Sequence, residues 1–176
     1  TTDGTNLYVA DTSNHLIRKI VIVTDTQTTL AGTGTGSSGS ANGTGTSASF
    51  NYPQGITTDG TNLYVADTTN NLIRKIVIST GAVTTVAGTG SSGSANGTGT
   101  SASFFNPMGI TTDGTNLYVA EYSNHLIRKI VISTGAVTTV AGTGSSGSAD
   151  GTGTSASFNY PQWITTDGTN LYVVDN

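Results

Sequence analysis

The chain has 176 residues, of which only 9% are charged, 24 are glycine and none is cysteine. Six basic residues against ten acidic ones argue against a general nucleic-acid binder. The absence of cysteine excludes a zinc ribbon, a disulfide-stabilised mini-protein and a thiol enzyme. No apolar run approaches the roughly 20 residues that a membrane helix requires, so we expect no membrane span, and no signal peptide is recognised in the sequence as it stands.

A repeated unit organises the whole chain. The tetrapeptide Thr-Thr-Asp-Gly begins at positions 1, 57, 111 and 165, which gives spacings of 56, 54 and 54 residues. All basic residues fall in one repeated Arg-Lys pair, and most acids recur at two fixed points of each copy. Such sparse and periodic charges indicate a repeated structural unit and not a disordered coil. We therefore divide the chain into repeats 1–56, 57–110 and 111–164 and the first strands of a fourth copy, 165–176.

The first half of each repeat predicts short strands joined by tight turns. In the second copy the strands are expected at 56–58, 63–66, 72–79 and 82–86. Asp59-Gly60 and Thr80-Gly81 lie between them as turn formers. Val, Ile and Thr outnumber strong helix formers, and apolar positions do not recur at helical spacing. This pattern is typical of a four-stranded antiparallel meander.

The predicted sheet is apolar on both faces. Leu63 and Val65 point to one face, while Tyr64 and Ala66 point to the other. Such a sheet needs cover on both sides, and further copies of itself supply this cover when meanders pack radially in a β-propeller. We therefore predict an all-β chain of about three propeller blades plus a partial fourth, as part of a larger ring or of an open repeat array.

The second half of each repeat is a connector of about 20 residues rich in Gly, Ser and Thr. A structureless loop of that length is uncommon in a compact domain and needs an anchor. One helical turn is expected at 46–50, and a proline follows each connector. We expect one aromatic residue per copy to be buried and to hold the loop: Phe50, Phe104 and Phe158.

These motifs resemble NHL repeats, which are propeller blades. The pattern is Pro-x-Gly-Ile, x-x-Asp-Gly, Leu-Tyr-Val-Ala-Asp and Asn-His-Leu-Ile-Arg-Lys, and Asn-His-Leu stands at 14–16 and 124–126. The second copy has Asn71 at the histidine position, so the blade does not require the histidine. The long connector ending in Ala-x-Phe is similar to that of bacterial secreted NHL proteins. The resemblance implies a fold and no single activity, because the family includes scaffolds, receptor sensor domains, RNA binders and lyases.

The acid that closes each second strand has two interpretations. A ring of these acids would hold a cation, but no Asp-x-Asp-x-Asp loop supplies the six to eight oxygens that calcium needs. We favour structural pairing with an arginine of the next strand, because an unpaired buried charge is costly. The acids are Asp11, Asp67, Glu121 and Asp175, and the expected arginine partners are Arg18, Arg74 and Arg128.

The two histidines do not build a catalytic site. The lyases that the resemblance brings in use several histidines that converge on a metal, whereas His15 and His125 occupy equivalent turns of different repeats. A Gly-x-Gly-x-x-Gly match at 88–93 follows a strand but opens no helix, so it predicts no nucleotide site. We predict that the protein is not an enzyme and has no cofactor and no metal.

The turns after the second strands and the long connectors are expected at the same end of the blades, where a rigid scaffold presents its loops. The hypothesis is a non-catalytic structural or interaction module of an extracellular or cell-surface protein. Its partners would be a protein or glycan, adjoining blades of a longer chain, or further copies. The alternative is a propeller that binds glycan or peptide, for which Tyr122 is the aromatic residue outside strands and pre-proline segments; a metal-dependent lyase or hydrolase is less favoured. The candidate binding residues are Asp11, Asn14, His15, Asp67, Asn70, Glu121, Tyr122, Asn124 and His125.

Overall fold

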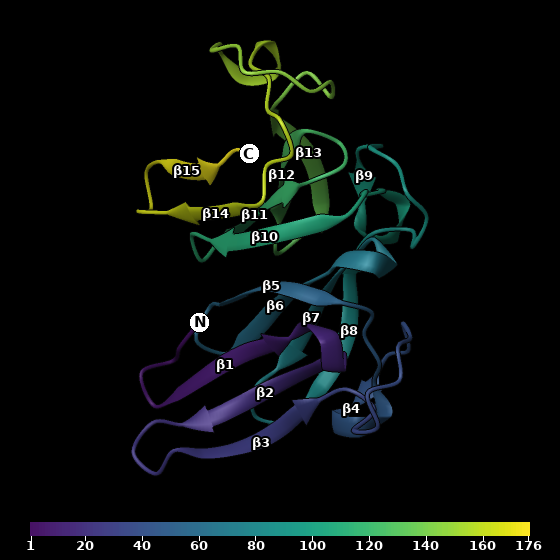
Figure 1. Ribbon diagram of the computed structural model, residues 1–176, viewed down its shortest axis with the longest axis vertical. Coiled ribbons are helices and arrows are strands. Elements are labelled where there is room, and N and C mark those ends of the chain that lie inside the picture. The colour runs from purple at the N-terminus through teal and green to yellow at the C-terminus, as the bar shows by residue number, and fades with distance from the viewer.

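The computed structural model describes residues 1–176, and its strands form four antiparallel sheets that follow one another along the chain (Figure 1). The first sheet contains β1 (Asn6–Asp11), β2 (Leu16–Val21) and β3 (Thr26–Ala31). The last contains β14 (Trp163–Thr166) and β15 (Leu171–Val174). The predicted all-β fold, with blades formed by antiparallel meanders, is confirmed.

The two central blades are complete. The first has the order β4 (Gly43–Thr44), β8 (Ala82–Ala87), β7 (Leu72–Val77), β6 (Asn62–Asp67) and β5 (Pro53–Thr58). The second has the order β9 (Gly97–Thr98), β13 (Ala136–Ala141), β12 (Leu126–Val131), β11 (Asn116–Glu121) and β10 (Pro107–Thr112). Each contains the four strands expected from the sequence and one further strand of two residues.

That further strand comes from the connector of the preceding repeat. Gly43 and Thr44 pair with Val83 and Ala82 at the outer edge of the next blade, and β9 pairs with β13 in the same way. Each connector also contains a 3-10 turn, at Gly45–Ser47, Gly99–Ser101 and Gly153–Ser155. Two more 3-10 turns, Thr12–Asn14 and Thr68–Asn70, follow the strands β1 and β6. The connectors are therefore ordered straps that join one blade to the next, and the helical turn expected at 46–50 is a 3-10 turn that ends at Ser47.

The inner strands β5, β10 and β14 lie side by side (Figure 1). Their spacing requires glycine, because a Cβ on Gly109 would lie 2.6 Å from the carbonyl oxygen of Gln162 and 2.9 Å from Cα of Trp163. The Thr-Thr-Asp-Gly boundaries at 57 and 111 fall inside β5 and β10. The sequence period and the structural blade are thus offset by a few residues.

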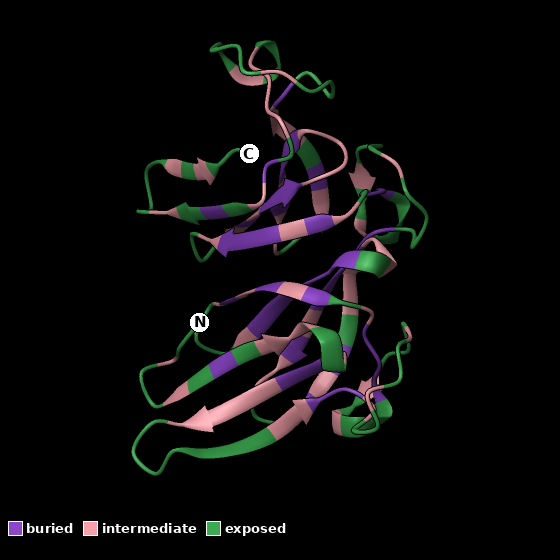
Figure 2. Cartoon of the chain, in the orientation of Figure 1, coloured by how far each residue is buried: buried purple, intermediate pink, exposed green.

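The core lies between adjacent blades, as the two apolar sheet faces predicted. Leu63 and Val65 pack in one buried cluster with Tyr8 and Ile17 of the preceding blade. Tyr64 and Ala66, on the opposite face, pack in a second cluster with residues of the next blade that include Leu117, Val119 and Ile130. Figure 2 shows the buried segments concentrated in the strands and the exposed ones in turns and connector tips.

The aromatic anchors of the connectors are buried where a following blade covers them. Phe50 and Phe104 are both fully buried, as predicted. Phe158 is only partly buried, which corrects the expectation for the third copy. The reason is that the last sheet has only β14 and β15, so no outer strand covers this connector.

Candidate functional site

The turns after the second strands and the connectors share one end of the blades; the first two connectors, with β4 and β9, lie on the right in Figure 1. We call this the connector end. The opposite end carries the Asp-Gly-Thr-Asn turns, in which Asp59 Oδ1 accepts hydrogen bonds from the backbone N–H of Thr61 (2.8 Å) and of Asn62 (2.7 Å). All nine candidate binding residues lie at the connector end, and the structure divides them into buried structural groups and exposed ones.

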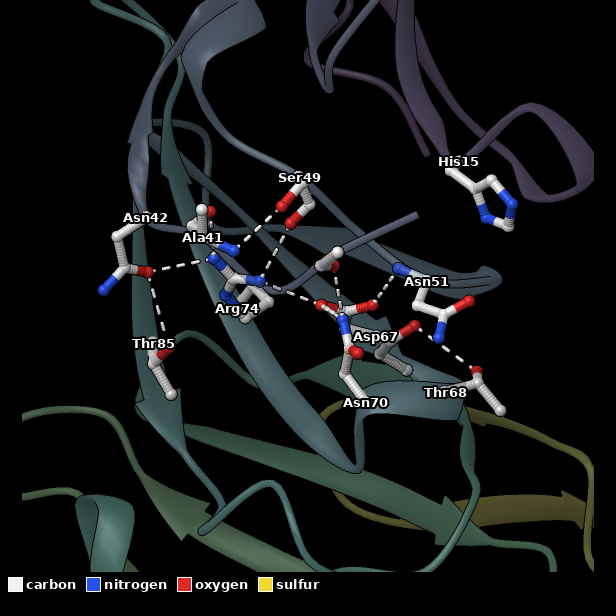
Figure 3. A network of polar contacts seen from close by, with 12 residues as sticks. His15, Ala41, Asn42, Ser49, Asn51, Asp67, Thr68, Asn70, Arg74 and Thr85 are labelled. Carbon is white, nitrogen blue, oxygen red and sulfur yellow. Dashed lines mark hydrogen bonds and ion pairs between the residues drawn. The ribbon is translucent and has the colours of Figure 1, made fainter. Parts of the chain in front are cut away.

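Asp67 is fully buried at the centre of a polar network (Figure 3). Its Oδ1 accepts a hydrogen bond from the backbone N–H of Asn51 at 2.8 Å. Its Oδ2 accepts hydrogen bonds from Nδ2 of Asn70 and from Nη1 of Arg74, both at 2.9 Å. Burial raises the pKa of Asp67, and these hydrogen bonds and the arginine charge oppose the rise. The predicted pairing of acid and arginine is confirmed, and the carboxylate has no oxygen left free for a ligand.

Arg74 connects this acid to the preceding connector. Its guanidinium donates to the carbonyl oxygens of Ala41 (3.0 Å) and Ser49 (3.2 Å) and to Oδ1 of Asn42 (2.9 Å). It also lies over the ring of Phe50, 5.3 Å from the ring centroid. The side chain is fully buried, so a single arginine fixes the strap to the blade.

The next blade repeats this arrangement residue by residue. Arg128 Nη1 lies 2.9 Å from Oε2 of Glu121, and both side chains are fully buried. Asn124 bridges Glu121 and the carbonyl oxygen of Gly93. In the first sheet no connector covers the pair, and Arg18 lies 3.4 Å from Asp11 with about a quarter of each side chain exposed (24% and 26%). Asn14 donates to the same carboxylate at 2.9 Å.

The histidines fasten each turn to the start of the next inner strand. Nδ1 of His15 accepts a hydrogen bond from the backbone N–H of Tyr52 at 3.0 Å. In the third copy, Nδ1 of His125 accepts the equivalent hydrogen bond from Tyr160 at 3.1 Å. Because Nδ1 accepts, the ring proton lies on Nε2. Asn71 explains why the second copy needs no histidine, since its Oδ1 accepts from the backbone N–H of residue 106 at 3.0 Å.

Exposed aromatic rings accompany these turns. Tyr52, Phe105 and Tyr160 are 48%, 39% and 40% exposed. The ring of His15 lies edge-on to Tyr52, with centroids 4.8 Å apart. Tyr160 contacts two rings, those of Tyr122 and His125, each with a centroid distance of 4.7 Å. We call the six residues the aromatic end surface: His15, Tyr52, Phe105, Tyr122, His125 and Tyr160.

The sequence pointed to three members of this surface, His15, Tyr122 and His125, and missed the other three. The sequence-based prediction of exposed aromatic residues was confined to positions outside the strands and the pre-proline segments, so it did not include these three. Phe50 anchors the connector as predicted, and Tyr52, two residues later, lies at the surface. The signal in the sequence is the contrast between invariant Ser-Phe and the variable dipeptide that follows it.

The connector end holds no assembled catalytic or metal centre. No three His, Asp or Glu side chains in the chain come close enough together to hold a metal ion. The acids of the two central blades are taken up by internal hydrogen bonds, and the two histidines lie in separate turns. No helix of the structure has the length and apolar character that crossing a membrane requires.

Four-stranded meanders packed face to face around adjacent inner strands define a segment of a β-propeller. No protein-family model matches the chain. The NHL repeat-containing protein 2 of Gallus gallus is 37% identical over 90 residues, which are 51% of this chain and 12% of that protein. The protein of the same name from Homo sapiens is 36% identical over 87 residues, or 49% of this chain and 12% of that protein. The blades are similar to the NHL repeats of these proteins, so the NHL resemblance seen in the sequence is confirmed, while the bacterial secreted type stays a prediction.

Solved structures share the fold over nearly the whole chain. A Bacteroides thetaiotaomicron protein of unknown function matches 97% of this chain and 42% of its own, with a TM-score of 0.78 and 26% identity. An auxiliary nutrient binding protein from the same organism has a TM-score of 0.75 at 20% identity, again over 97% of this chain and 42% of its own. A chain of a nidogen/laminin complex has a TM-score of 0.59 at 16% identity, and the match covers 97% of this chain and 68% of that one. The chain thus spans 12% of the curated relatives and less than half of the Bacteroides chains.

Proposed function

We propose that the protein is a non-catalytic interaction module of an extracellular or cell-surface repeat protein and that it contacts its partner through the connector end. One observation carries this proposal. The charged groups of the two central blades are consumed in internal hydrogen bonds at this end, whereas aromatic rings beside them remain exposed. Aromatic residues with a polar edge are enriched at interfaces because they contribute much contact area at little cost in entropy.

The extracellular setting is supported by composition. A cysteine-free chain with few charges and long Gly/Ser/Thr straps fits a bacterial surface protein. Two structures that share the fold have names consistent with such a setting, an auxiliary nutrient binding protein and a nidogen/laminin complex. At 20% and 16% identity they share the fold alone, so the binding role is an inference from the exposed surface.

A catalytic role is the less favoured candidate. Virginiamycin B lyase from Staphylococcus aureus shares the fold with a TM-score of 0.55 at 18% identity. A metal-dependent lyase would need converging histidines, and here His15 and His125 each accept a backbone hydrogen bond in a different blade. Elemental analysis of the purified protein is expected to find no stoichiometric metal, and a stoichiometric metal would revive this candidate.

Hydroxyl-radical footprinting tests the proposed face directly. The protein is oxidised alone and after incubation with separate protein and polysaccharide fractions of a cell surface. We expect one fraction to protect Tyr52, Tyr122 and Tyr160 at the connector end, while Tyr172, which is exposed and whose hydroxyl group donates to Asp167 at the opposite end, is unchanged. Protection at the opposite end, or no protection by either fraction, would refute the proposal.

A further inference from the structure

The differences between the repeats are concentrated at one end of the blades. Repeats 57–110 and 111–164 differ at nine of 54 positions. One difference exchanges the buried acid Asp67 for Glu121 at the end of the second strand, three lie in the turn that follows, four flank the proline that opens the next inner strand, and one exchanges Asn96 for Asp150. The outer strands, the opposite turns and the rest of the connectors are identical, although many of their residues are exposed. Undirected divergence would spread over exposed positions, so the side chains at this end are the ones whose identity matters.

The two variable segments change together, and they touch. Ser-Asn-His in the turn occurs with Asn-Tyr-Pro-Gln in the first and third copies, and Thr-Asn-Asn occurs with Phe-Asn-Pro-Met in the second. In every copy the last turn residue accepts a hydrogen bond from the residue before the proline. The blade therefore has two interchangeable versions of one local unit, a His–Tyr version and an Asn–Asn version, with the same backbone contact.

The His–Tyr version adds an exposed ring at a strained position. Tyr52 and Tyr160 have φ angles of 52° and 54°, a left-handed conformation that disfavours bulky residues. Asn106 has φ of 50° at the same position, and asparagine adopts this conformation more readily. Each tyrosine ring contacts a histidine ring, yet 48% of Tyr52 and 40% of Tyr160 stay exposed. What the tyrosine version contributes is the ring face that it presents.

The surface around these rings carries few accessible charges. Asp11 and Arg18, which pair with each other and are about a quarter exposed, lie in the blade of the first His–Tyr unit, and the exposed Asp175 accepts a hydrogen bond from the backbone N–H of Asn159 beside Tyr160. The acid and the arginine of each central blade are fully buried, so neither is accessible to a ligand. A cleft of about 340 Å³ between the first two connectors, beside the turn of the second copy, is likewise lined by neutral groups, among them Ser40, Asn70, Thr85 and Thr89. Aromatic faces accept the C–H faces of sugar rings, while hydroxyl, amide and imidazole N–H groups exchange hydrogen bonds with sugar hydroxyls. A charged ligand would find little countercharge here.

We propose that the aromatic end surface binds a neutral carbohydrate chain through two equivalent subsites, His15–Tyr52 and His125–Tyr160. Tyr122 adds a further ring at the second subsite. The Asn71–Asn106 unit of the second blade presents no tyrosine and is not a subsite. This inference rests on the proposed function and names the class of its partner. Because one chain carries two subsites, a polymer that spans both binds more tightly than a short oligosaccharide.

The repeats supply the variants that test this proposal. The triple variant His125→Asn, Asn159→Phe, Tyr160→Asn gives the third copy the residues of the second and retains the turn hydrogen bond. Affinity electrophoresis in gels containing neutral glucan, xylan, mannan or galactan measures binding, with alginate as the acidic probe. We expect at least one neutral polymer to retard the unaltered protein and the triple variant to bind it about tenfold more weakly.

Two further variants complete the design. The reverse variant Asn71→His, Phe105→Asn, Asn106→Tyr creates a third His–Tyr unit and is expected to strengthen binding. Val23→Ser, at an exposed turn where the other copies have serine, is the matched control and is expected to change nothing. The circular dichroism spectrum and urea midpoint of each variant establish that it folds.

Four results would overturn the carbohydrate proposal. These are no retardation by any neutral polymer, retardation that the triple variant leaves unchanged, equal loss in the Val23→Ser control, and binding to alginate alone. If the footprinting experiment shows that only a protein fraction protects Tyr52 and Tyr160, the interaction face stands and the carbohydrate assignment fails. If no fraction protects them and no polymer binds, both proposals fail.

Discussion

Replacing Arg74 with methionine tests whether the buried arginine holds the connector to the blade. The substitution keeps an unbranched apolar stem against Phe50 but removes every donor of the guanidinium. Asp67 is then a buried carboxylate without a countercharge, the carbonyl oxygen of Ser49 loses its arginine donor, and that of Ala41 keeps only the bond from the backbone N–H of Ser49. Removing one partner of a buried pair costs about 3–5 kcal/mol, because the remaining charge is left uncompensated.

The first sheet contains the matched control. Arg18 occupies the same strand position, but it pairs with Asp11 at 3.4 Å, is partly exposed and contacts no connector. We expect Arg18→Met to lower the free energy of unfolding by no more than about 1 kcal/mol. In urea, with a slope of about 2 kcal/mol/M, Arg74→Met would lower the unfolding midpoint by roughly 2 M and Arg18→Met by less than about 0.5 M.

A second comparison distinguishes the loss of the ion pair from the cost of leaving the Asp67 carboxylate buried without a countercharge. The double variant Asp67→Leu, Arg74→Met removes both charges, so it is expected to be more stable than Arg74→Met alone. Equal midpoints for Arg74→Met and Arg18→Met would refute the idea that the connector contacts matter. A double variant less stable than the single one would show that the acid contributes through its bonds to Asn51 and Asn70 and not through its charge.

Three further measurements follow from the same geometry. Gly109→Ala is expected to lower the free energy of unfolding by about 1–3 kcal/mol, because its methyl group meets the backbone of Gln162; an unchanged urea midpoint would refute the close packing of the inner strands. Burial works to raise the pKa of Asp113, but the hydrogen bonds of its turn outweigh this and hold it at about 2, so its stabilisation is full above about pH 4 and is lost towards pH 2. Asp113→Asn should make the urea midpoint fall less over this range, and part of the fall should remain because the pKa values of Asp3, Asp59 and Asp167 are lowered as well; a fall as steep as in the unaltered protein would contradict this role of Asp113. Burial and its hydrogen bond to a carboxylate raise the pKa of Tyr64 to about 12, so its stabilisation should fade between about pH 10 and 12, and Tyr64→Phe should remove one late step from the ultraviolet titration of the tyrosines.

The fold was largely predictable because its signals are local and repeated. The turns at Asp59-Gly60 and Thr80-Gly81 bound the strands to within a few residues, and the apolar pattern of 63–66 required cover on both faces. The connector could not be predicted in the same way. Its two-residue strand Gly43–Thr44 has no periodicity, and it forms because Arg74, more than 30 residues away in the sequence, fixes the adjacent carbonyls.

The location of the candidate site was predictable from the sequence, but which of its residues are buried and which are exposed was not. Alternation of turns along a meander places His15 and the connector at the same end, as the structure shows. Sequence alone does not reveal that Asp67 and Asn70 are turned inwards while Tyr52 is turned outwards. Whether a side chain is buried or exposed here depends on which groups the preceding connector covers, and that cover is a contact between repeats.

The same chemistry explains why the arginine recurs in every copy and its acid changes only from Asp67 to Glu121, while the end surface varies more widely. Arg74, its acid and the connector carbonyls form a closed hydrogen-bond network, so any single change strands a buried polar group. The turn and the proline segment are also joined by contacts outside the exchanged pair, such as that from Thr68 Oγ1 to the carbonyl oxygen of Pro107, whereas the side chain that accepts from the pre-proline N–H is either His or Asn. The exchanged pair can therefore change while the backbone contact between the two segments is kept. A repeat whose connector is held in place and whose end surface can vary is able to alter what it binds while its fold stays the same.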